Sequence, residues 1–235
     1  MSARAPILYS FRRCPYAMRA RMALQAARIT CELREVALAR KPDQMLEASP
    51  KGSVPVLVLP SGRVIDESLE IMEWALSGND PHRWREVQPA QAALWLWLID
   101  GQFKHHLDRY KYADRYEGAD AETHREGGLK LLERMEAAIA ERGFLAAARE
   151  TYVDIAAFPF VRQFANTDRA WFDAQPLPRL QGWLAAFLGD PRFASVMVKY
   201  KPWEAGETGP LVFSRGSDHT SALAAGSGPS GRIGV

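Results

Sequence analysis

The sequence predicts an α/β N-terminal domain followed by an all-helical domain. In residues 7–77, short β-prone runs and helix-forming segments alternate in the order β-α-β-α-β-β-α. From Gln88 onward, apolar residues recur at helical spacing, and a Gly-, Asn- and Pro-containing stretch separates the two regions. We therefore expect an α/β domain in 1–78, a linker in 79–87, an all-helical domain in 88–204 and a flexible Gly/Ser-rich tail in 205–235.

The first strand and the first helix flank a cysteine. Residues 7–11 form a short apolar run that predicts a buried strand, and residues 16–27 are rich in Ala, Met, Leu and Arg, which favour helix. Pro15 suits the first turn of that helix, because the N–H that proline lacks would have no partner there. Cys14 is therefore expected at or next to the helix N-cap.

The same kinds of pattern predict the remaining strands and helices. In the α/β region the pattern predicts a strand over 31–38, a short helix over 41–48, a β-prone run over 54–59 whose residues 56–59 form a hairpin with 64–66, and a helix over 68–76. In the helical region it predicts helices over 88–116, 120–142, 178–188 and 191–199, and one more that begins after the sequence Thr151-Tyr152-Val153-Asp154. That sequence matches a capping box with Asp at its fourth position, and Pro159 is expected to bend the helix that follows.

Composition excludes several functional classes. The formal net charge is +2, from 30 basic and 28 acidic side chains, which is too small an excess to indicate a nucleic-acid partner or an acidic membrane surface. The most apolar stretch, 92–99, is too short to span a bilayer, and no signal peptide is evident at the N-terminus. Two cysteines do not form a disulfide framework, so we expect a cytoplasmic protein with free thiols.

Cys14 is the candidate nucleophile. A thiol at a helix N-terminus faces unpaired N–H groups and the positive end of the helix dipole, and Arg12, Arg13 and Arg19 are near in sequence. Such settings lower a cysteine pKa and favour the thiolate. Position 17 is alanine, so no Cys-x-x-Cys disulfide can form, and a mixed disulfide on Cys14 would need an external thiol to resolve it. Cys31 opens a strand and is expected to be a packing residue.

The residues around Cys14 resemble the cysteine-type, omega-class glutathione transferases. These proteins share a Cys-Pro-aromatic-Ala run followed by an Arg-x-Arg helix, which matches residues 14–17 and 19–21 here. The likeness continues through Leu38, Lys41-Pro42, Ser53-Val54-Pro55-Val56-Leu57 and Asp66-Glu67-Ser68, at intervals that match without a gap. The resemblance implies a thioredoxin-like N-terminal domain, an all-helical C-terminal domain, glutathione as co-substrate in the cleft between them, and a homodimer.

The resemblance also implies a role for individual residues. Cys14 would meet the glutathione sulfur, with Tyr16 packed near it. Val54, before a cis Pro55, would pair its backbone with the cysteinyl part of glutathione, as an added strand would. The remaining contacts would come from Leu38 and Lys41 near the glycine carboxylate, and from Glu67 and Ser68 at the γ-glutamyl end.

The predicted helix over 88–116 would line the second substrate pocket. Its aromatic residues would suit an apolar co-substrate, although Trp95, Trp97 and Phe103 are expected to be core. No metal site is expected, since the adjacent His105 and His106 point to different faces of a helix. Removing the capping residue Asp154 is expected to cost about 0.5–2 kcal/mol of stability rather than activity.

Three functions remain open. The first is a glutathione-dependent thiol transferase or reductase, in which Cys14 forms a mixed disulfide with glutathione. The second is conjugation of glutathione to hydrophobic electrophiles, with Tyr9 or Ser10 activating the glutathione thiol. The third is a non-catalytic interaction protein on the same fold. The partners expected are glutathione and a small thiol, disulfide or electrophile.

Overall fold

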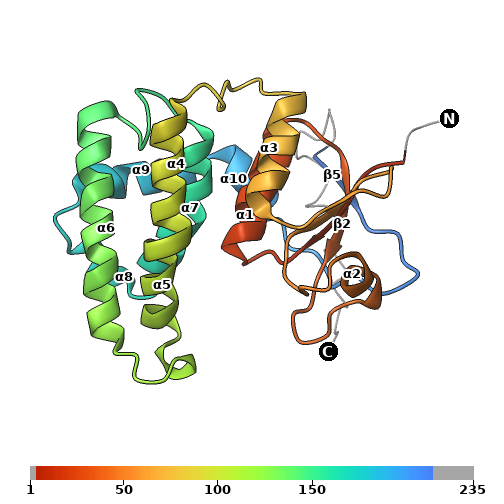
Figure 1. The fold of residues 1–235 in the computed structure, drawn as a ribbon, viewed down its shortest axis with the longest axis horizontal. Helices are drawn as coiled ribbons and strands as arrows, with labels where there is room; N and C mark the ends of the chain where they lie inside the picture. The colour runs from red at the N-terminus through yellow and green to blue at the C-terminus, as the bar shows by residue number, and fades with distance from the viewer. Residues whose placement is uncertain (1–3, 214–235) are drawn as a thin grey trace, which may run out of the picture.

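The N-terminal part has the predicted order of strands and helices. The structure is a computed structural model that describes residues 4–213. Its first elements are β1 (Ile7–Ser10), α1 (Pro15–Ala26), β2 (Cys31–Glu35), α2 (Asp43–Ala48), β3 (Val56–Val58), β4 (Val64–Ile65) and α3 (Ser68–Gly78). This is the β-α-β-α-β-β-α order that the sequence predicts, and Figure 1 shows α1 and α3 between the sheet and the helices α4, α5, α6 and α7.

The sheet has the strand order β4-β3-β1-β2-β5. β1 and β2 are parallel, with Leu8 opposite Leu33, and α1 supplies the crossover that a parallel pair needs. β3 runs antiparallel to β1, with Leu8 opposite Leu57, and β4 pairs antiparallel with β3 as the predicted hairpin. The arrangement places the C-terminal end of β1, and therefore Cys14, beside the segment that leads into β3.

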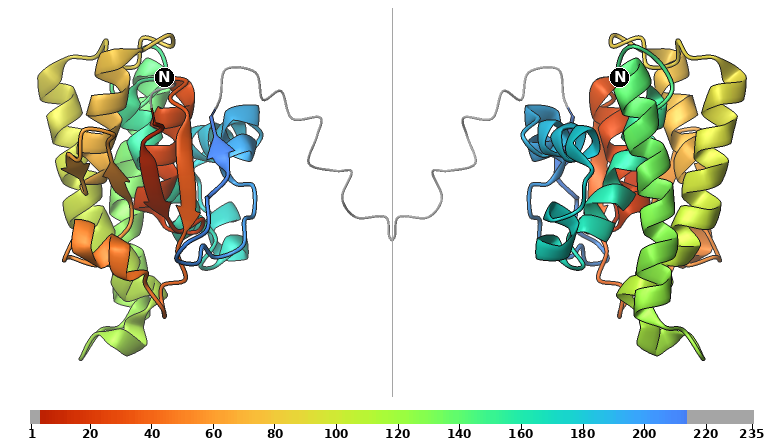
Figure 2. Two further views of the ribbon diagram at one scale, coloured as in Figure 1. Left: turned by 90° about the vertical axis from the view of Figure 1, so that its right-hand side faces the viewer. Right: turned by 90° about the vertical axis from the view of Figure 1, so that its left-hand side faces the viewer.

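The chain returns to the sheet after the helices, which corrects part of the predicted tail. β5 (Leu211–Val212) pairs antiparallel with β2, and Figure 2 shows it at one edge of the sheet. Val212 is buried, and a Cβ at Gly209 would overlap the Leu33 carbonyl, so glycine allows the backbone to approach β2 this closely. A strand of only two residues can form here because β2 supplies its hydrogen-bonding partner. The rest of the predicted tail, 214–235, lies outside the described residues.

The C-terminal part is helical. It consists of α4 (Pro89–Leu98), the π-helix η1 (Ile99–Phe103), α5 (Lys104–Lys111), the 3-10 helix η2 (Ala113–Arg115), α6 (Ala121–Arg142), α7 (Tyr152–Ala165), α8 (Arg169–Asp173), α9 (Pro178–Leu188) and α10 (Pro191–Val196). The helix predicted over 88–116 is thus divided by a π turn. Such turns insert a residue into the helical register and are frequent at functional sites. No helix in residues 4–213 is long and apolar enough to cross a membrane.

The predicted linker 79–87 contains no helix or strand, but it is anchored at Trp84. This side chain is 1% exposed, and its Nε1 donates to Glu150 Oε1 at 2.7 Å. The apolar core is continuous from α1 and α3 into α7. Because this core is continuous, the domain boundaries at 78 and 88 stay a prediction. α3 ends at Gly78 and α4 begins at Pro89, on either side of the predicted linker.

α7 is the central helix of the C-terminal part. Its capping box of Thr151 and Asp154 is present as predicted, and Pro159 lies inside the helix. Asp154 is completely buried and accepts hydrogen bonds from three backbone or indole N–H groups and one hydroxyl: Leu145 N, Thr151 N, Thr151 Oγ1 and Trp183 Nε1, at 3.0 to 3.1 Å. The carboxylate therefore connects the loop before α7 to α9 as well as capping its own helix.

Candidate active site

Cys14 is the N-cap residue of α1. Its φ and ψ of −73° and 124° are extended, while Met18 N already donates to its carbonyl at 2.9 Å. The preceding turn is closed by a bond from Cys14 N to the Phe11 carbonyl at 3.0 Å. The thiol is half-buried, and Sγ donates to the Val54 carbonyl oxygen at 3.6 Å. The sequence placed Cys14 correctly because Pro15 fixes the first turn of the helix.

The expected low pKa of Cys14 is not found. Burial raises the pKa of the thiol above its ordinary value, and this effect outweighs the opposing ones. The N–H groups of Ala17 and Tyr16 at the helix N-terminus, and then the charges of Arg21 and Lys104, act to lower it. The helix-terminus argument was therefore correct in sign, but desolvation of the thiolate is larger.

Two cations near the thiol, Arg21 and Lys104, were not singled out from the sequence as its electrostatic partners. Arg21 is 1% exposed, and no carboxylate within residues 4–213 lies within ion-pair distance of it. Its Nη2 donates to the Arg12 carbonyl at 2.7 Å, and burial lowers the pKa of Arg21 to about 10. Its position seven residues after Cys14, two turns along the same helix, is the signal that could have identified it. No sequence spacing identifies Lys104 in this way, because the π turn η1 determines the helical register of α5.

Arg19, which was expected to add charge near the thiol, is occupied elsewhere. Its guanidinium forms a bidentate pair with Asp100 of η1, at 2.8 and 2.9 Å, and its Nε donates to Ser68 Oγ at 3.0 Å. Arg19 is 2% exposed, so this pair connects the first helix, the start of α3 and the helical part in a buried setting. Asp100 neutralises the charge that the sequence argument assigned to the thiol.

Val54 and Pro55 lie next to the thiol. Their peptide bond is cis, as the resemblance implies, and both residues are buried before β3. Lys41 is exposed, with its side chain packed beside Gly52, where a Cβ would lie 3.4 Å from Nζ. Leu38 is 46% exposed. The two residues expected at the glycine carboxylate thus lie on the accessible loop between β2 and α2.

Glu67 and Ser68 begin α3, but only one of them is exposed. Glu67 is the N-cap residue and extends into solvent, where Lys51 Nζ donates to its Oε1 at 2.7 Å. Lys51 also pairs with Asp66 at 3.1 Å, and bonds from Ser49 and Lys51 lower the pKa of Asp66. Ser68 is 3% exposed. Lys51, two residues before Ser53, is a candidate site residue that the sequence did not single out.

Tyr16 connects the thiol region to the helical part. Its ring packs edge-on against Phe160 of α7 with centroids 4.9 Å apart, and Lys104 Nζ lies 5.6 Å from its centroid. Burial, and then the charge of Asp100, raises the pKa of Tyr16 to about 12. Tyr16 thus remains a neutral hydroxyl at neutral pH.

Most of the expected core residues are buried. Trp95 and Phe103 are 5% and 0% exposed, as predicted, but Trp97 is 62% exposed, so its assignment to the core was wrong. Because α4 covers the bundle with one face only, Trp97 falls on the opposite face. Cys31 is fully buried, and burial raises its pKa to about 12, which confirms its packing role.

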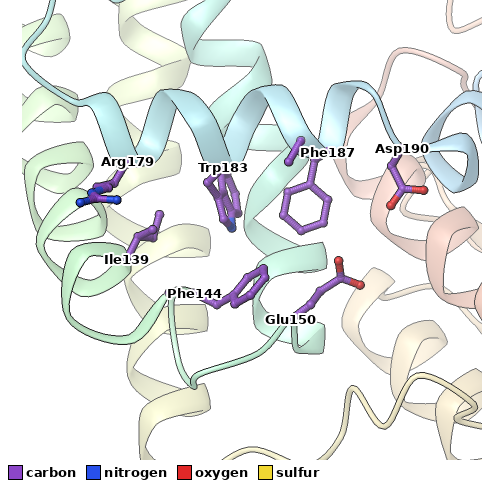
Figure 3. A pocket seen from close by; sticks show the side chains of 9 residues that line it. Ile139, Phe144, Glu150, Arg179, Trp183, Phe187 and Asp190 are labelled. Atoms are coloured by element: carbon purple, nitrogen blue, oxygen red, sulfur yellow. The ribbon is translucent and has the colours of Figure 1, made fainter.

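One cavity lies in the helical part, and Cys14 does not line it. It has a volume of about 240 Å³ and lies between α9 and the segment that follows α6. Figure 3 shows Trp183 and Phe187 of α9 facing Phe144 and Ile139, with Glu150 and Asp190 at one end. A second hollow is on the outer face of α3, beside Leu69 and Trp74. Neither is lined by the residues around Cys14.

Comparisons with known proteins match both halves of the chain. The model for the glutathione S-transferase N-terminal domain matches residues 8–90, and the model for its C-terminal domain matches residues 104–186. A probable glutathione transferase of Aplysia californica is 44% identical over 63 residues, covering 27% of this chain and 67% of that protein. Glutathione S-transferase omega-1 of Mus musculus is 24% identical over 197 residues, covering 83% and 82%.

A solved structure gives the same fold. A glutathione S-transferase from Rhodospirillum rubrum has a TM-score of 0.69 to this chain at 22% identity, covering 87% of this chain and 96% of that one. The 24% identity to omega-1 is too low to assign the chain to a class within these enzymes.

Proposed function

The chain belongs to the glutathione S-transferase superfamily, and from that premise we propose that it is a glutathione-dependent thiol transferase or reductase. The observation that carries the proposal is the position of Cys14, a half-buried thiol at the N-terminus of α1 beside the Val54 carbonyl. Arg21 and Lys104 supply positive charge toward it. Cys31, the other cysteine, is buried in β2.

The chemistry proceeds in two thiol–disulfide exchanges. The Cys14 thiolate attacks the glutathione sulfur of a glutathionylated substrate, which forms the Cys14–glutathione disulfide and releases the substrate thiolate, which takes up a proton. A second glutathione, as its thiolate, attacks the glutathione sulfur of that disulfide. Oxidised glutathione leaves and the Cys14 thiolate is regenerated. The net reaction converts one mixed disulfide and one glutathione into one substrate thiol and one oxidised glutathione.

The surrounding residues support a specific orientation of glutathione. Val54 offers a backbone N–H and C=O to the cysteinyl part, immediately beside Sγ of Cys14. The helix N-terminus at Glu67 and Ser68 offers N–H groups and a carboxylate to the γ-glutamyl end. Lys41, exposed on the loop after β2, suits the glycine carboxylate.

Lys51 adds a cation to the γ-glutamyl end. Its ammonium group pairs with both Asp66 and Glu67. In the proposed complex the carboxylates of Asp66 and Glu67 bind the γ-glutamyl ammonium, and Lys51 binds the γ-glutamyl carboxylate. We expect Lys51→Ala to raise the KM for glutathione several-fold with a smaller effect on kcat.

Intact-mass measurement tests the proposal directly. Incubation with oxidised glutathione should add one glutathione to the wild type and to the Cys31→Ser variant, and none to Cys14→Ser. The adduct should disappear when reduced glutathione is added. Absence of an adduct on Cys14, under conditions in which iodoacetamide does alkylate it, would overturn the proposal.

The conjugation alternative has weaker support from the site. Tyr9 and Ser10, the hydroxyls considered for activating glutathione, are buried in β1. Tyr9 OH accepts from Arg34 at 2.7 Å, and its ring packs against Trp203 at 6.1 Å. Ser10 Oγ has no hydrogen-bond partner among the described residues, but Ser10 is 0% exposed and Tyr9 2%, so neither hydroxyl is accessible to a glutathione thiol in this arrangement. If conjugation is nevertheless the main activity, Cys14→Ser will retain it.

The non-catalytic alternative predicts that the chain does not bind glutathione at all. Retention on immobilised glutathione, with release by free glutathione, distinguishes it from both enzymatic functions. We expect the wild type to be retained and Lys51→Ala to elute earlier.

The homodimer and the cytoplasmic location are also proposals. The exposed apolar residues Leu94 and Trp97 of α4, which are 43% and 62% exposed, support a second copy as partner. Light scattering should give twice the chain mass for the wild type, and Trp97→Glu should shift it toward the monomer. A monomeric wild type at micromolar concentration would contradict the dimer.

A further inference from the structure

Three histidines of the helical part meet between α5 and α6. His105 and His106 are consecutive on α5, and His124 lies in the first turn of α6. One ring nitrogen from each residue lies within 4.8 Å of the other two. The sequence shows only the adjacent pair His105 and His106. Tertiary packing brings His124 of α6 next to them.

The distances between the ring nitrogens suit a metal ion. His106 Nδ1 and His124 Nδ1 are 3.1 Å apart. Two imidazoles on a tetrahedral Zn²⁺, with Zn–N bonds of about 2.0–2.1 Å, have nitrogens about 3.3–3.4 Å apart. This pair is therefore close to the required spacing, and His105 is exposed, so its ring can turn toward the same point.

The backbone of α6 makes room for one of the rings. A Cβ at Gly127 would overlap the His106 imidazole, so this glycine lets the ring lie close against α6. The ring is thereby held toward His124, one turn earlier on α6. The two helices are also packed extensively against each other, which fixes the separation of their histidines.

We propose that His105, His106 and His124 form a binding site for a divalent transition-metal ion that prefers imidazole ligands, with Zn²⁺ as the representative ion. Three protein ligands leave a fourth position for water. The ion would crosslink α5 and α6, which the segment 112–120 connects in the chain. Because α5 also carries Lys104, the site would stabilise the helix that contributes to the environment of Cys14.

The charges around the cluster set its affinity. Arg109 Nη1 lies 3.0 Å from His105 Nδ1, and its guanidinium also stacks over Tyr116 at 4.4 Å. Burial and the neighbouring imidazoles lower the pKa of His106, which agrees with the neutral form that binds metals. Lys130 is a second nearby cation, and Asp120 is the acidic residue that faces His124. Arg109 thus competes with the ion for His105 and repels it.

Isothermal titration calorimetry with ZnCl₂ tests the site. The experiment uses untagged full-length protein carrying Cys14→Ser, so that the half-buried Cys14 thiol does not compete for zinc. We expect one saturable site at micromolar concentration and no response to Mg²⁺ or Ca²⁺, which prefer oxygen ligands. Co²⁺ should give the visible absorption of a four-coordinate ion, and Zn²⁺ should raise the melting temperature.

Matched histidine variants separate the site from adventitious binding. His105→Ala, at an exposed position that does not threaten folding, and His124→Ala should each weaken binding at least about tenfold. His82→Ala and His219→Ala, the two other histidines of the chain, should leave it unchanged, and Arg109→Gln should tighten it. Equal affinity in the His105 and His82 variants, or no binding at 100-fold excess zinc, would overturn the proposal.

Discussion

Replacing Asp154 with alanine should destabilise the protein by more than a helix cap normally contributes. Without the carboxylate, the N–H groups of Leu145, Thr151 and Trp183 lose their acceptor in a buried setting. Each unsatisfied buried donor costs about 1–3 kcal/mol, or about 6 kcal/mol together. Removing the carboxylate offsets part of this loss, because keeping it ionised inside the protein is itself unfavourable.

The offset follows from the pKa of Asp154. Burial raises the pKa of Asp154 from 3.8 to about 6, which corresponds to about 3 kcal/mol at pH 7. The net cost of Asp154→Ala at pH 7 is then about 3 kcal/mol. This exceeds the value of about 0.5–2 kcal/mol expected for a cap alone.

The pH dependence of that cost has a definite sign. The folded state binds the carboxyl proton more tightly than the unfolded state does, so the stability that this group contributes is fully present below pH 3.8 and is lost as the pH rises through 6. The cost of Asp154→Ala should therefore be larger at pH 5 than at pH 7, by about 1 kcal/mol.

Urea denaturation followed by circular dichroism at both pH values measures these quantities. Asp168→Ala is the matched control, because Asp168 caps α8 at the surface by accepting from Trp171 N at 3.0 Å. Its cost should be about 1 kcal/mol at pH 7. A cost for Asp154→Ala below 1 kcal/mol at pH 7, or a smaller cost at pH 5, would refute the reasoning.

Three further predictions follow from single contacts. Lys104→Gln removes a charge that lowers the pKa of Cys14, so the pH profile of iodoacetamide alkylation should shift to higher pH, and an unchanged profile would exclude this role. Asp100→Ala leaves the Arg19 guanidinium buried without its partner and should cost about 3 kcal/mol in urea denaturation, whereas a loss under 1 kcal/mol would contradict a buried pair. Val212→Asp places a charge in the buried strand β5 and should lower the melting temperature by several degrees, and no change would argue against β5 as part of the folded sheet.

The parts of the fold that local rules determine could be predicted from the sequence. Pro15 and the helix formers after it place Cys14 at the N-cap, and the Thr151–Asp154 spacing identifies the start of α7. These features depend on neighbours within a few residues. β5 does not, since Leu211 and Val212 become a strand only by pairing with β2, about 180 residues earlier.

The electrostatics of the site could not be predicted for a similar reason. Sequence proximity favoured Arg19 as a charge near the thiol, but the π turn η1 brings Asp100 to Arg19 and sets the register of Lys104. Lys51 reaches Glu67 across a loop. In each case tertiary contacts decide which charges are neutralised, and the number of arginines near Cys14 in the sequence carries no such information.

The raised pKa of Cys14 determines how the proposed reaction depends on its surroundings. Each unit by which a thiol pKa lies above the ambient pH reduces the thiolate fraction about tenfold, while the intrinsic nucleophilicity rises only about threefold, so attack slows about threefold per unit. A high pKa also makes Cys14 a poorer leaving group when the second glutathione attacks. Both steps are therefore accelerated by whatever offsets burial. In this site those groups are the α1 N-terminus, Arg21 and Lys104. The proposed catalysis would therefore rely on Arg21, two turns along the same helix, and on Lys104, which is distant from Cys14 in sequence.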